Sequence, residues 1–166
     1  MEANGQEMSR AHVVTISDRA SAKQMEDESG PALARILAQA QFEVSGPQVV
    51  PDDLRRIADA IVDAVDLGAD VVVTTGGTGL GPRDVTPQAT SEVIDFEVPG
   101  IAETMRLAGA AKTPMAALSR GLAGVRGRAL IINVPGSVKG ATESLDAVMP
   151  MLGHAVRLLH GDTTHD

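Results

Sequence analysis

The segment Asp70 to Thr75, with the sequence DVVVTT, restricts the fold of this chain more than any other feature. Its apolar part is short, β-branched and flanked by helical patterns, which is typical of a strand covered on both faces. Strands of this kind lie inside parallel sheets, because the connections between parallel strands place helices over both faces. The segment leads directly into the glycine-rich stretch 76–82. We therefore predict a central parallel strand that ends in a glycine-rich loop.

Short strand patterns and amphipathic helix patterns alternate along the rest of the chain. Strands are predicted at 12–16, 42–50 and 128–134, and helices near 30–37, 53–65, 87–96, 100–111 and 145–159. The 166 residues, 43% of them hydrophobic, suffice for one domain with a buried core. The expected fold class is α/β: a single three-layer domain with a mostly parallel sheet covered by helices on both faces. We place it at 11–160, between a mobile N-terminal extension, 1–10, and a C-terminal tail, 161–166.

Two helix starts carry polar residues that suit the N-cap position. Ser29 precedes Gly30 and Pro31 and is the expected cap of the helix that they open. Asp52 lies at the expected cap position of a strongly amphipathic helix, and an N-cap is the simplest interpretation for either Asp52 or Asp53. A second role for one of these two aspartates, as a metal ligand, stays open at this point.

Composition excludes several classes of function. The formal net charge of −8 argues against general binding to DNA or RNA, and with two phenylalanines as the only aromatic residues the chain has no surface on which bases stack. The absence of cysteine excludes disulfides, zinc ribbons, iron–sulfur clusters and a thiol nucleophile. No segment is apolar enough to span a membrane, and the first residues lack a signal-peptide pattern. We therefore expect a cytoplasmic protein that binds neither nucleic acid nor a membrane.

Three predicted strands end in polar or glycine-rich loops, at 17–23, 76–84 and 135–139. Since the carboxyl ends of parallel strands lie at one edge of a sheet, these loops should converge where open α/β sheets bind their ligands. Cations gathered in one cleft can bind an anion even when the net charge of the chain is negative, although solvated loops are the alternative. The basic residues in or beside loops are Arg19, Lys23, Arg83, Arg120 and Lys139.

The loop TTGGTGLGPRD at 74–84 places four glycines within six positions. Glycine lets main-chain N–H groups approach an anion closely, although a turn that only reverses the chain would need glycine as well. The loop fits neither a Walker A motif nor G-x-G-x-x-G. Arg83 and Asp84 suit a phosphate and a divalent metal, or a local ion pair. Asp18 is open to two interpretations as well, a ligand or an Asx turn.

Several motifs in a fixed order make the chain resemble the molybdenum cofactor biosynthesis family that includes MogA, MoaB and the G domains of gephyrin. The main motif is TTGGTGLGPRDVTPQAT at 74–90. The likeness extends from about 11 to 160 through ISDRAS (16–21), SGP (29–31), VPDD (50–53), VPGIAETMR (98–106) and LSRGLAGVRGRALIINVPGS (118–137). An ordered set of motifs is far more specific than one glycine-rich loop.

The resemblance implies a compact α/β protein, usually a homotrimer, that binds molybdopterin. In the adenylyltransferase members of the family, Mg²⁺-bound ATP reacts with molybdopterin, so that AMP passes to the molybdopterin phosphate and pyrophosphate is released. The expected function is therefore that of a molybdopterin adenylyltransferase, with Mg²⁺ as cofactor and ATP and molybdopterin as substrates. Hand-over of the product to other molybdenum cofactor enzymes is a further partnership that the resemblance suggests.

The functional positions of the family carry over to residues of this chain. Asp84 and Asp52 match the acidic positions associated with metal binding and catalysis. The positions that match the nucleotide-binding and pterin-binding loops are Ser17, Asp18, Thr75, Gly76, Gly77, Thr78, Gly79, Arg83, Ser119, Arg120, Pro135, Gly136, Ser137 and Lys139. We expect the glycine loop to cradle phosphate and Arg83 or Lys139 to neutralise charge. Ser137 is a mild departure, because many family members carry an amide there.

Two other functions remain open on the sequence. A MoaB-like member would bind molybdopterin or its precursor without efficient adenylylation, and it would carry the same motifs. A trimeric scaffold domain, whose surface matters more than its pocket, is the more distant alternative. With so few aromatic residues, the chain should hold a pterin through hydrogen bonds, carboxylates and aliphatic walls rather than by stacking.

Overall fold

The computed structural model of the chain describes residues 7–164. Most of the predicted extension, 1–6, and the end of the predicted tail, 165–166, lie outside the described residues. The first strand, β1 (Arg10–Ile16), begins at the last residue assigned to that extension. The N–H of Arg10 donates to the Asp70 carboxylate at 2.7 Å, and the N–H of Asp70 donates to the Arg10 carbonyl at 2.8 Å. The sheet therefore extends one residue beyond the predicted domain boundary.

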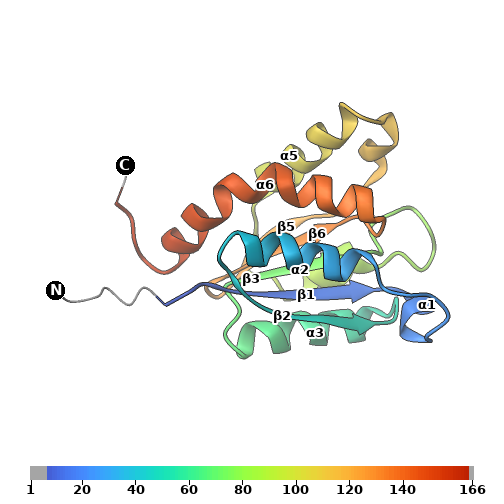
Figure 1. The fold of residues 1–166 in the computed structure, drawn as a ribbon, viewed down its shortest axis with the longest axis horizontal. Coiled ribbons are helices and arrows are strands. Elements are labelled where there is room, and N and C mark those ends of the chain that lie inside the picture. The colour runs from blue at the N-terminus through green and yellow to red at the C-terminus, as the bar shows by residue number, and fades with distance from the viewer. Residues whose placement is uncertain (1–6, 165–166) are drawn as a thin grey trace.

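Six strands form one sheet in the order β2-β1-β3-β6-β5-β4. The strands β2 (Glu43–Val50), β1, β3 (Val71–Thr75) and β6 (Ala129–Val134) are parallel. At the far edge, β5 (Ala123–Arg126) is antiparallel to β6, and β4 (Phe96–Glu97) is antiparallel to β5. In Figure 1, β1 and β2 point toward the short helix α1 (Asp18–Ser21) and away from both termini. The predicted mostly parallel sheet is confirmed.

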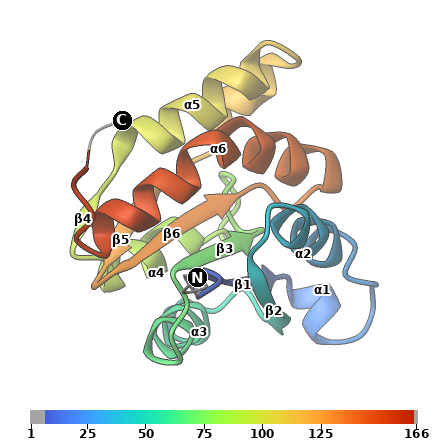
Figure 2. The ribbon, with the colours of Figure 1, turned by 60° about the vertical axis from the view of Figure 1, so that its left-hand side comes forward.

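Helices cover both faces of this sheet and give the three predicted layers (Figure 2). On one face lie α2 (Ser29–Gln39), α5 (Pro99–Ala110) and α6 (Val138–Leu159). On the other lie α3 (Leu54–Asp66) and α4 (Thr86–Val93). A 3₁₀ helix, η1 (Pro114–Leu118), follows α5. None of the helices between residues 7 and 164 has the length and hydropathy needed to span a bilayer.

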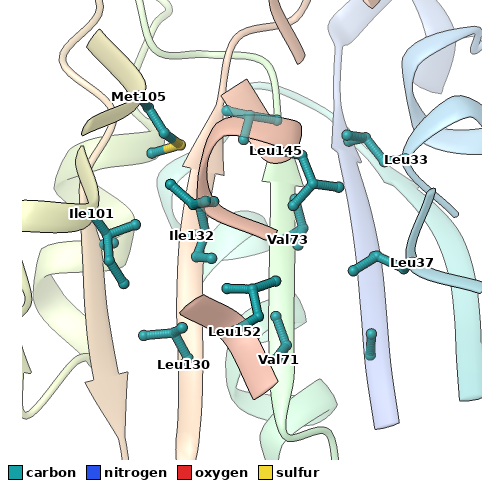
Figure 3. Packing of buried hydrophobic residues seen from close by; sticks show 14 of the residues in the cluster. Leu33, Leu37, Val71, Val73, Ile101, Met105, Leu130, Ile132, Leu145 and Leu152 are labelled. Carbon is teal, nitrogen blue, oxygen red and sulfur yellow. The ribbon is translucent and has the colours of Figure 1, made fainter. Parts of the chain in front are cut away.

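Successive residues of the central strand β3 enter two separate hydrophobic clusters. Val71 and Val73 pack with α2, α5 and α6, whereas Val72 packs with α3 and α4. Figure 3 shows Leu145 and Leu152 of α6 over β3 and β6. Burying one leucine side chain stabilises the fold by about 1.5–3 kcal/mol. Because each cluster buries many apolar side chains, the helices on both faces hold the sheet in place. The burial of this strand on both faces, predicted from its apolar run, is confirmed.

Two features between β3 and β6 differ from the prediction. The helix predicted at 87–96 ends at Val93, because Ile94 takes an extended conformation and the N–H of Asp95 donates to the Val125 carbonyl at 2.6 Å. Phe96 therefore enters strand β4 rather than a helix. The strand β5 was not predicted. It has only four residues, one of them glycine, so its sequence shows no hydrophobic alternation.

The cap predicted at Ser29 is wrong, and of the two aspartates considered at α3 the cap is Asp53 and not Asp52. Ser29 is the first residue of α2 and does not cap it; the N–H of Gly30 is bound by the Asp27 carboxylate at 3.0 Å. At α3 the cap is Asp53, whose carboxylate accepts a hydrogen bond from a main-chain N–H of the first turn at 2.9 Å. Asp52 is therefore the aspartate that does not cap the helix, and it lies at the carboxyl edge of the sheet.

Candidate active site

Loops that follow the four parallel strands meet at the carboxyl edge of the sheet and enclose a cavity of about 720 Å³, the larger cavity. This volume lies within the usual range for small-molecule sites. The predicted site residues that line it are Ser17, Asp18, Asp52, Thr75, Gly76, Gly77, Asp84, Gly136 and Ser137. The loops predicted to converge at this edge therefore do so.

A second cavity of about 310 Å³, the smaller cavity, adjoins the first and is lined by α5, η1 and the start of α6. The predicted site residues that line it are Thr78, Gly79, Ser119, Pro135 and Ser137. Its walls include the apolar side chains of Met105, Met115 and Leu118. Ser137 lines both cavities. The site residues inferred from sequence thus divide between two cavities that share the glycine loop and the loop before α6.

Asp18 and Asp52 are bound to each other at the edge of the larger cavity. The N–H of Asp18 donates to Oδ2 of Asp52 at 2.9 Å, and the N–H of Asp52 donates to Oδ1 of Asp18 at 3.0 Å. Arg83 joins this pair: Nε and Nη2 donate to the Asp18 carboxylate, and Nη2 also donates to the main-chain oxygen of Asp52 at 3.1 Å. These contacts tie together the loops that follow β1, β2 and β3.

The two carboxylates differ in their electrostatic environment. The hydrogen bond from the Arg83 guanidinium lowers the pKa of Asp18 below its ordinary value. Partial burial raises the pKa of Asp52 above its ordinary value, and the negative charges of Asp18 and Asp84 also raise it. Because burial and like charges both disfavour the ionised form, a cation close to Asp52 would stabilise its carboxylate.

Asp84 is held by its own loop and not by Arg83. The local ion pair considered for Arg83 and Asp84 does not form, because Arg83 pairs with Asp18. Oδ2 of Asp84 accepts a hydrogen bond from the N–H of Gly81 at 2.9 Å. A Cβ atom at Gly79 or Gly81 would lie 3.0 or 2.8 Å from that oxygen. The two glycines therefore let the loop close around the Asp84 carboxylate.

Main-chain N–H groups of the glycine loop form a candidate anion site. Gly76 and Gly77 have φ angles of +104° and +68°, a region that favours glycine. A side chain at Gly76 would also collide with the carbonyl oxygen of Ile16. Within the described residues, the N–H groups of Gly77, Thr78 and Gly79 donate to no protein acceptor. Consecutive N–H groups of this kind make an anion-binding nest.

The N-terminus of α6 also opens onto the larger cavity, through Ser137 and Val138. Ser137 caps this helix and accepts a hydrogen bond from the N–H of Gly140 at 3.1 Å. A helix N-terminus favours anions because its first N–H groups lack partners and carry partial positive charge. The acidic residues that line the same cavity are Asp18, Glu26, Asp27, Glu28, Asp52 and Asp84. N–H donors beside an excess of carboxylates suit a phosphate that binds together with a divalent cation.

Three cations predicted as site residues do not line either cavity. Arg83 is bound by Asp18, as described above. Arg120 donates hydrogen bonds to main-chain carbonyls of the glycine loop. Lys139 is exposed in the first turn of α6. The structure therefore brings the predicted carboxylates and glycines to the cavities, but it does not bring these three side chains there.

Asn133 and Asp27 are site residues that the sequence analysis missed. Asn133 is buried in β6 and lines the smaller cavity; its Nδ2 donates to the hydroxyls of Thr74 and Thr90 at 2.9 and 3.0 Å. Asp27 lines the larger cavity and accepts a hydrogen bond from the Thr15 hydroxyl at 2.8 Å. An amide inside an apolar strand was a usable signal for Asn133, whereas Asp27 lies among other acidic residues and had none.

Comparisons with known proteins agree with this architecture. A family model described as "Probable molybdopterin binding domain" matches residues 12–154. The crystal structure of the molybdopterin biosynthesis enzyme MoaB from Thermus thermophilus is 52% identical to this chain, with a TM-score of 0.87 over 93% of this chain and 98% of that one. A curated relative from Helicobacter pylori (strain J99), named molybdopterin adenylyltransferase, is 39% identical over 156 residues, which cover 90% of this chain and 87% of the relative.

Other curated relatives are much longer than this chain. The molybdenum cofactor biosynthesis bifunctional protein of Synechococcus elongatus is 38% identical over 151 residues, which are 91% of this chain and 47% of that protein. The chain spans 26% and 22% of two further relatives. Since the family model covers most of the chain and the similar proteins share its fold, this chain belongs to the MogA/MoaB family of molybdenum cofactor biosynthesis proteins.

Proposed function

We propose that this protein is a molybdopterin adenylyltransferase, which transfers AMP from ATP to the terminal phosphate of molybdopterin. The observation that carries the proposal is a pair of adjoining cavities around one glycine loop, whose N–H groups at 77–79 bind no protein acceptor among the described residues. Two substrates in adjoining cavities can place their phosphates at the shared wall. Relatives that bear this enzyme name, at 39–40% identity, support the same reaction class.

The proposed reaction asks the protein to align two anions. An oxygen of the molybdopterin phosphate bonds to the α-phosphorus of ATP, and the bond from that phosphorus to the oxygen bridging to the β-phosphate breaks, so that pyrophosphate leaves. The attacking phosphate is already ionised, so no side chain has to take a proton from it. We assign phosphate binding to the glycine loop and to the N-terminus of α6, whose N–H donors lie ready in place.

The residues at the larger cavity fit a Mg²⁺ ion. Mg²⁺ is commonly bound by one or two carboxylates and completes its shell with water and substrate phosphate. Asp52 and Asp84 each give one oxygen to a main-chain N–H, and the other oxygen of each accepts no hydrogen bond from the described residues. Between residues 7 and 164 no group of three or more His, Cys, Asp or Glu side chains is placed to hold a metal. We propose Asp52 and Asp84 as the protein ligands of Mg²⁺, which would supply charge neutralisation at the phosphates.

This assignment changes the role expected for two basic residues. We propose that Arg83 acts by holding Asp18 and the main chain of Asp52 in place, because its guanidinium already has these partners. Charge neutralisation then falls to the metal and to the N–H donors. No contact among the described residues supports a ligand-binding role for Lys139.

A direct assay tests the proposal. Purified protein is incubated with molybdopterin and ATP, with and without Mg²⁺, and both pyrophosphate release and the mass of adenylylated molybdopterin are followed. We expect the wild type to form product only with Mg²⁺. The rate of product formation by Asp84→Asn should be lower by about 100-fold or more. Asp53→Asn is the matched control, because asparagine also caps helices and Asp53 lines neither cavity. Wild-type turnover by Asp84→Asn, with binding intact, would contradict the metal assignment.

A second candidate function is binding of molybdopterin or its precursor without efficient adenylylation. The observation that favours it is the 52% identity to the MoaB structure from Thermus thermophilus, against 39% to the relative named adenylyltransferase from Helicobacter pylori. The same assay separates the two functions. Tight molybdopterin binding by the wild type, without pyrophosphate release, would establish the binding protein and refute the transferase.

We also propose that the protein forms a homotrimer through the surface of α5 and η1. Leu107, Met115 and Leu118 expose 76%, 63% and 50% of their surface on these two elements, which pack against each other, and exposed apolar patches mark interaction sites. Light scattering at several protein concentrations tests this proposal. We expect a trimer mass for the wild type and a smaller mass for Leu107→Glu. A monomer mass at every concentration would refute both the trimer and the scaffold alternative that requires one.

A further inference from the structure

We propose that Arg120 is a positioning residue, which fixes the glycine loop between the two cavities and does not bind a substrate phosphate. The inference rests on the proposed adenylyl transfer and assigns a residue to the geometry of that site. Arg120 belongs to the LSR segment at 118–120, which the family resemblance places near the pterin, so a direct contact with substrate is the alternative. The structure distinguishes the two roles by the partners of its side chain.

Every nitrogen of Arg120 donates to the glycine loop or to α4. Nε donates to the carbonyl of Gly79 at 2.8 Å, Nη2 to the carbonyl of Asp84 at 2.7 Å and Nη1 to Oε1 of Gln88 at 3.3 Å. The main-chain N–H donates to the carbonyl of Thr78 at 2.8 Å. The guanidinium lines neither cavity. Three of the five guanidinium N–H groups therefore donate to the protein.

These contacts set the direction of the N–H groups that face no protein acceptor. A peptide unit is planar and trans, so its C=O and the following N–H point in opposite directions. The main-chain N–H of Arg120 holds the carbonyl of Thr78 and so aims the N–H of Gly79 away from Arg120. The guanidinium holds the carbonyl of Gly79 and does the same for the N–H of Leu80. The N–H of Gly79 belongs to the candidate anion nest, and the side chain of Arg120 fixes the same residue through its carbonyl.

The same side chain connects the two cavities. Gly79 lines the smaller cavity, and Asp84 lines the larger one. The guanidinium fork is rigid and planar, so binding both carbonyls fixes the spacing between these two walls. Transfer of AMP between substrates in adjoining cavities depends on that spacing.

Arg120 is supported in turn by α5. Nη1 of Arg106 donates to the carbonyl of Gly121 at 2.9 Å and lies 3.4 Å from the carbonyl of Ser119. These are the residues on either side of Arg120. A chain of hydrogen bonds therefore runs from a helix in the hydrophobic core, through 119–121, to the glycine loop.

Lysine and glutamine at position 120 separate positioning from charge. Arg120→Lys keeps the positive charge, but its single terminal nitrogen cannot reproduce the fork that binds two carbonyls. For a positioning residue we expect both Arg120→Lys and Arg120→Gln to lower kcat by about 10- to 100-fold and to change the KM for ATP by less than about threefold. Wild-type kcat in Arg120→Lys, with a raised KM only in Arg120→Gln, would show a charge contact with phosphate and overturn the proposal.

A measurement without substrate keeps this test independent of the proposed function. Hydrogen exchange is followed at the N–H groups of Gly81, Asp84 and Thr86, which are hydrogen-bonded inside the loop. We expect exchange at least about tenfold faster in both variants of Arg120, because the loop opens more often. The matched control is Arg126→Lys, which removes an arginine contact to the Val93 carbonyl away from both cavities and should leave loop exchange unchanged.

The two kinds of failure are distinguishable. Unchanged exchange in both Arg120 variants overturns the positioning role whether or not the protein has transferase activity. Faster exchange in the variants, together with a wild type that releases no pyrophosphate, supports the positioning role and refutes only the proposed transferase.

Discussion

Asp18 and Asp52 each donate a main-chain N–H to the other residue's carboxylate, at 2.9 and 3.0 Å. They lie 34 positions apart in the sequence and follow the neighbouring strands β1 and β2. Each carboxylate thus has one oxygen fixed by the partner's backbone before any ligand binds. A site whose acidic groups are oriented in advance loses less entropy when it binds substrate and metal.

Asp52→Asn should gain stability relative to the wild type as the pH rises. Burial raises the pKa of Asp52 in the folded state above the ordinary value of 3.8. A raised carboxyl pKa favours folding below that value, and this contribution is lost as the pH rises through the folded pKa. The difference in free energy of unfolding, variant minus wild type, should therefore be larger at pH 7 than at pH 4. Urea unfolding in EDTA measures it, and a difference that falls with pH would contradict the effect of burial.

Adding Mg²⁺ should instead stabilise the wild type relative to Asp52→Asn. A cation that binds only the folded wild type stabilises it by mass action, whereas asparagine supplies no charge for the metal. We expect millimolar Mg²⁺ to raise the Tm of the wild type, and to leave the Tm of Asp52→Asn nearly unchanged. Calorimetry in a magnesium salt free of Ca²⁺, and in a sodium salt at equal ionic strength, separates Mg²⁺ binding from the general screening of charges by salt. Equal shifts in both proteins would count against Asp52 as a ligand.

Arg83→Met should return the pKa of Asp18 toward its ordinary value. The Arg83 guanidinium lowers that pKa by hydrogen bonding and by its charge. Lowering a carboxyl pKa stabilises the fold above the ordinary value of 3.8, and this contribution disappears as the pH falls through the folded pKa. The variant should therefore lose stability relative to the wild type at pH 6 but little at pH 2.5. NMR titration of the Asp18 carboxyl carbon reads the pKa directly, and an unshifted midpoint would disprove the pairing.

Gly76→Ala should destabilise the fold by about 1–3 kcal/mol or more. Its φ of +104° disfavours any side chain, and a Cβ atom there would collide with the Ile16 carbonyl. Gly100→Ala is the control, because that position lies in α5 with no atom within 4 Å of an added Cβ. The control should be neutral or stabilising by about 0.5–1 kcal/mol. Equal unfolding midpoints for the two variants in urea would contradict this account of the loop.

Asn133→Ala should cost about 2–4 kcal/mol, because it leaves buried polar groups without partners. The amide donates to the hydroxyls of Thr74 and Thr90, and its oxygen accepts the N–H of Leu122 at 3.2 Å. A double-mutant cycle with Thr90→Val tests the network in thermal unfolding. The two losses should add to more than the loss in the double variant. Strict additivity would mean that these residues do not interact.

Much of the fold could be predicted because it depends on local patterns. The apolar run of β3 and the 3.6-residue periodicity of α3 each lie within one element, and both elements form as predicted. The convergence of loops at one sheet edge followed from parallel strands in general. The prediction that helix α4 continues to Phe96 was wrong, because Phe96 pairs with strand β5, which lies far along the chain.

The sequence by itself determined the α/β layers and the glycine loop, since each depends on neighbours along the chain, and it placed acidic residues directly after strands that end at one sheet edge. Only the tertiary structure decided that Arg83 binds Asp18, that Arg120 holds the glycine loop, and that the site divides into two cavities. These hydrogen bonds join residues 36 to 65 positions apart. Their formation depends on the order of the strands in the sheet and on how far each loop extends beyond its strand. Neither can be inferred from the spacing of residues within one segment.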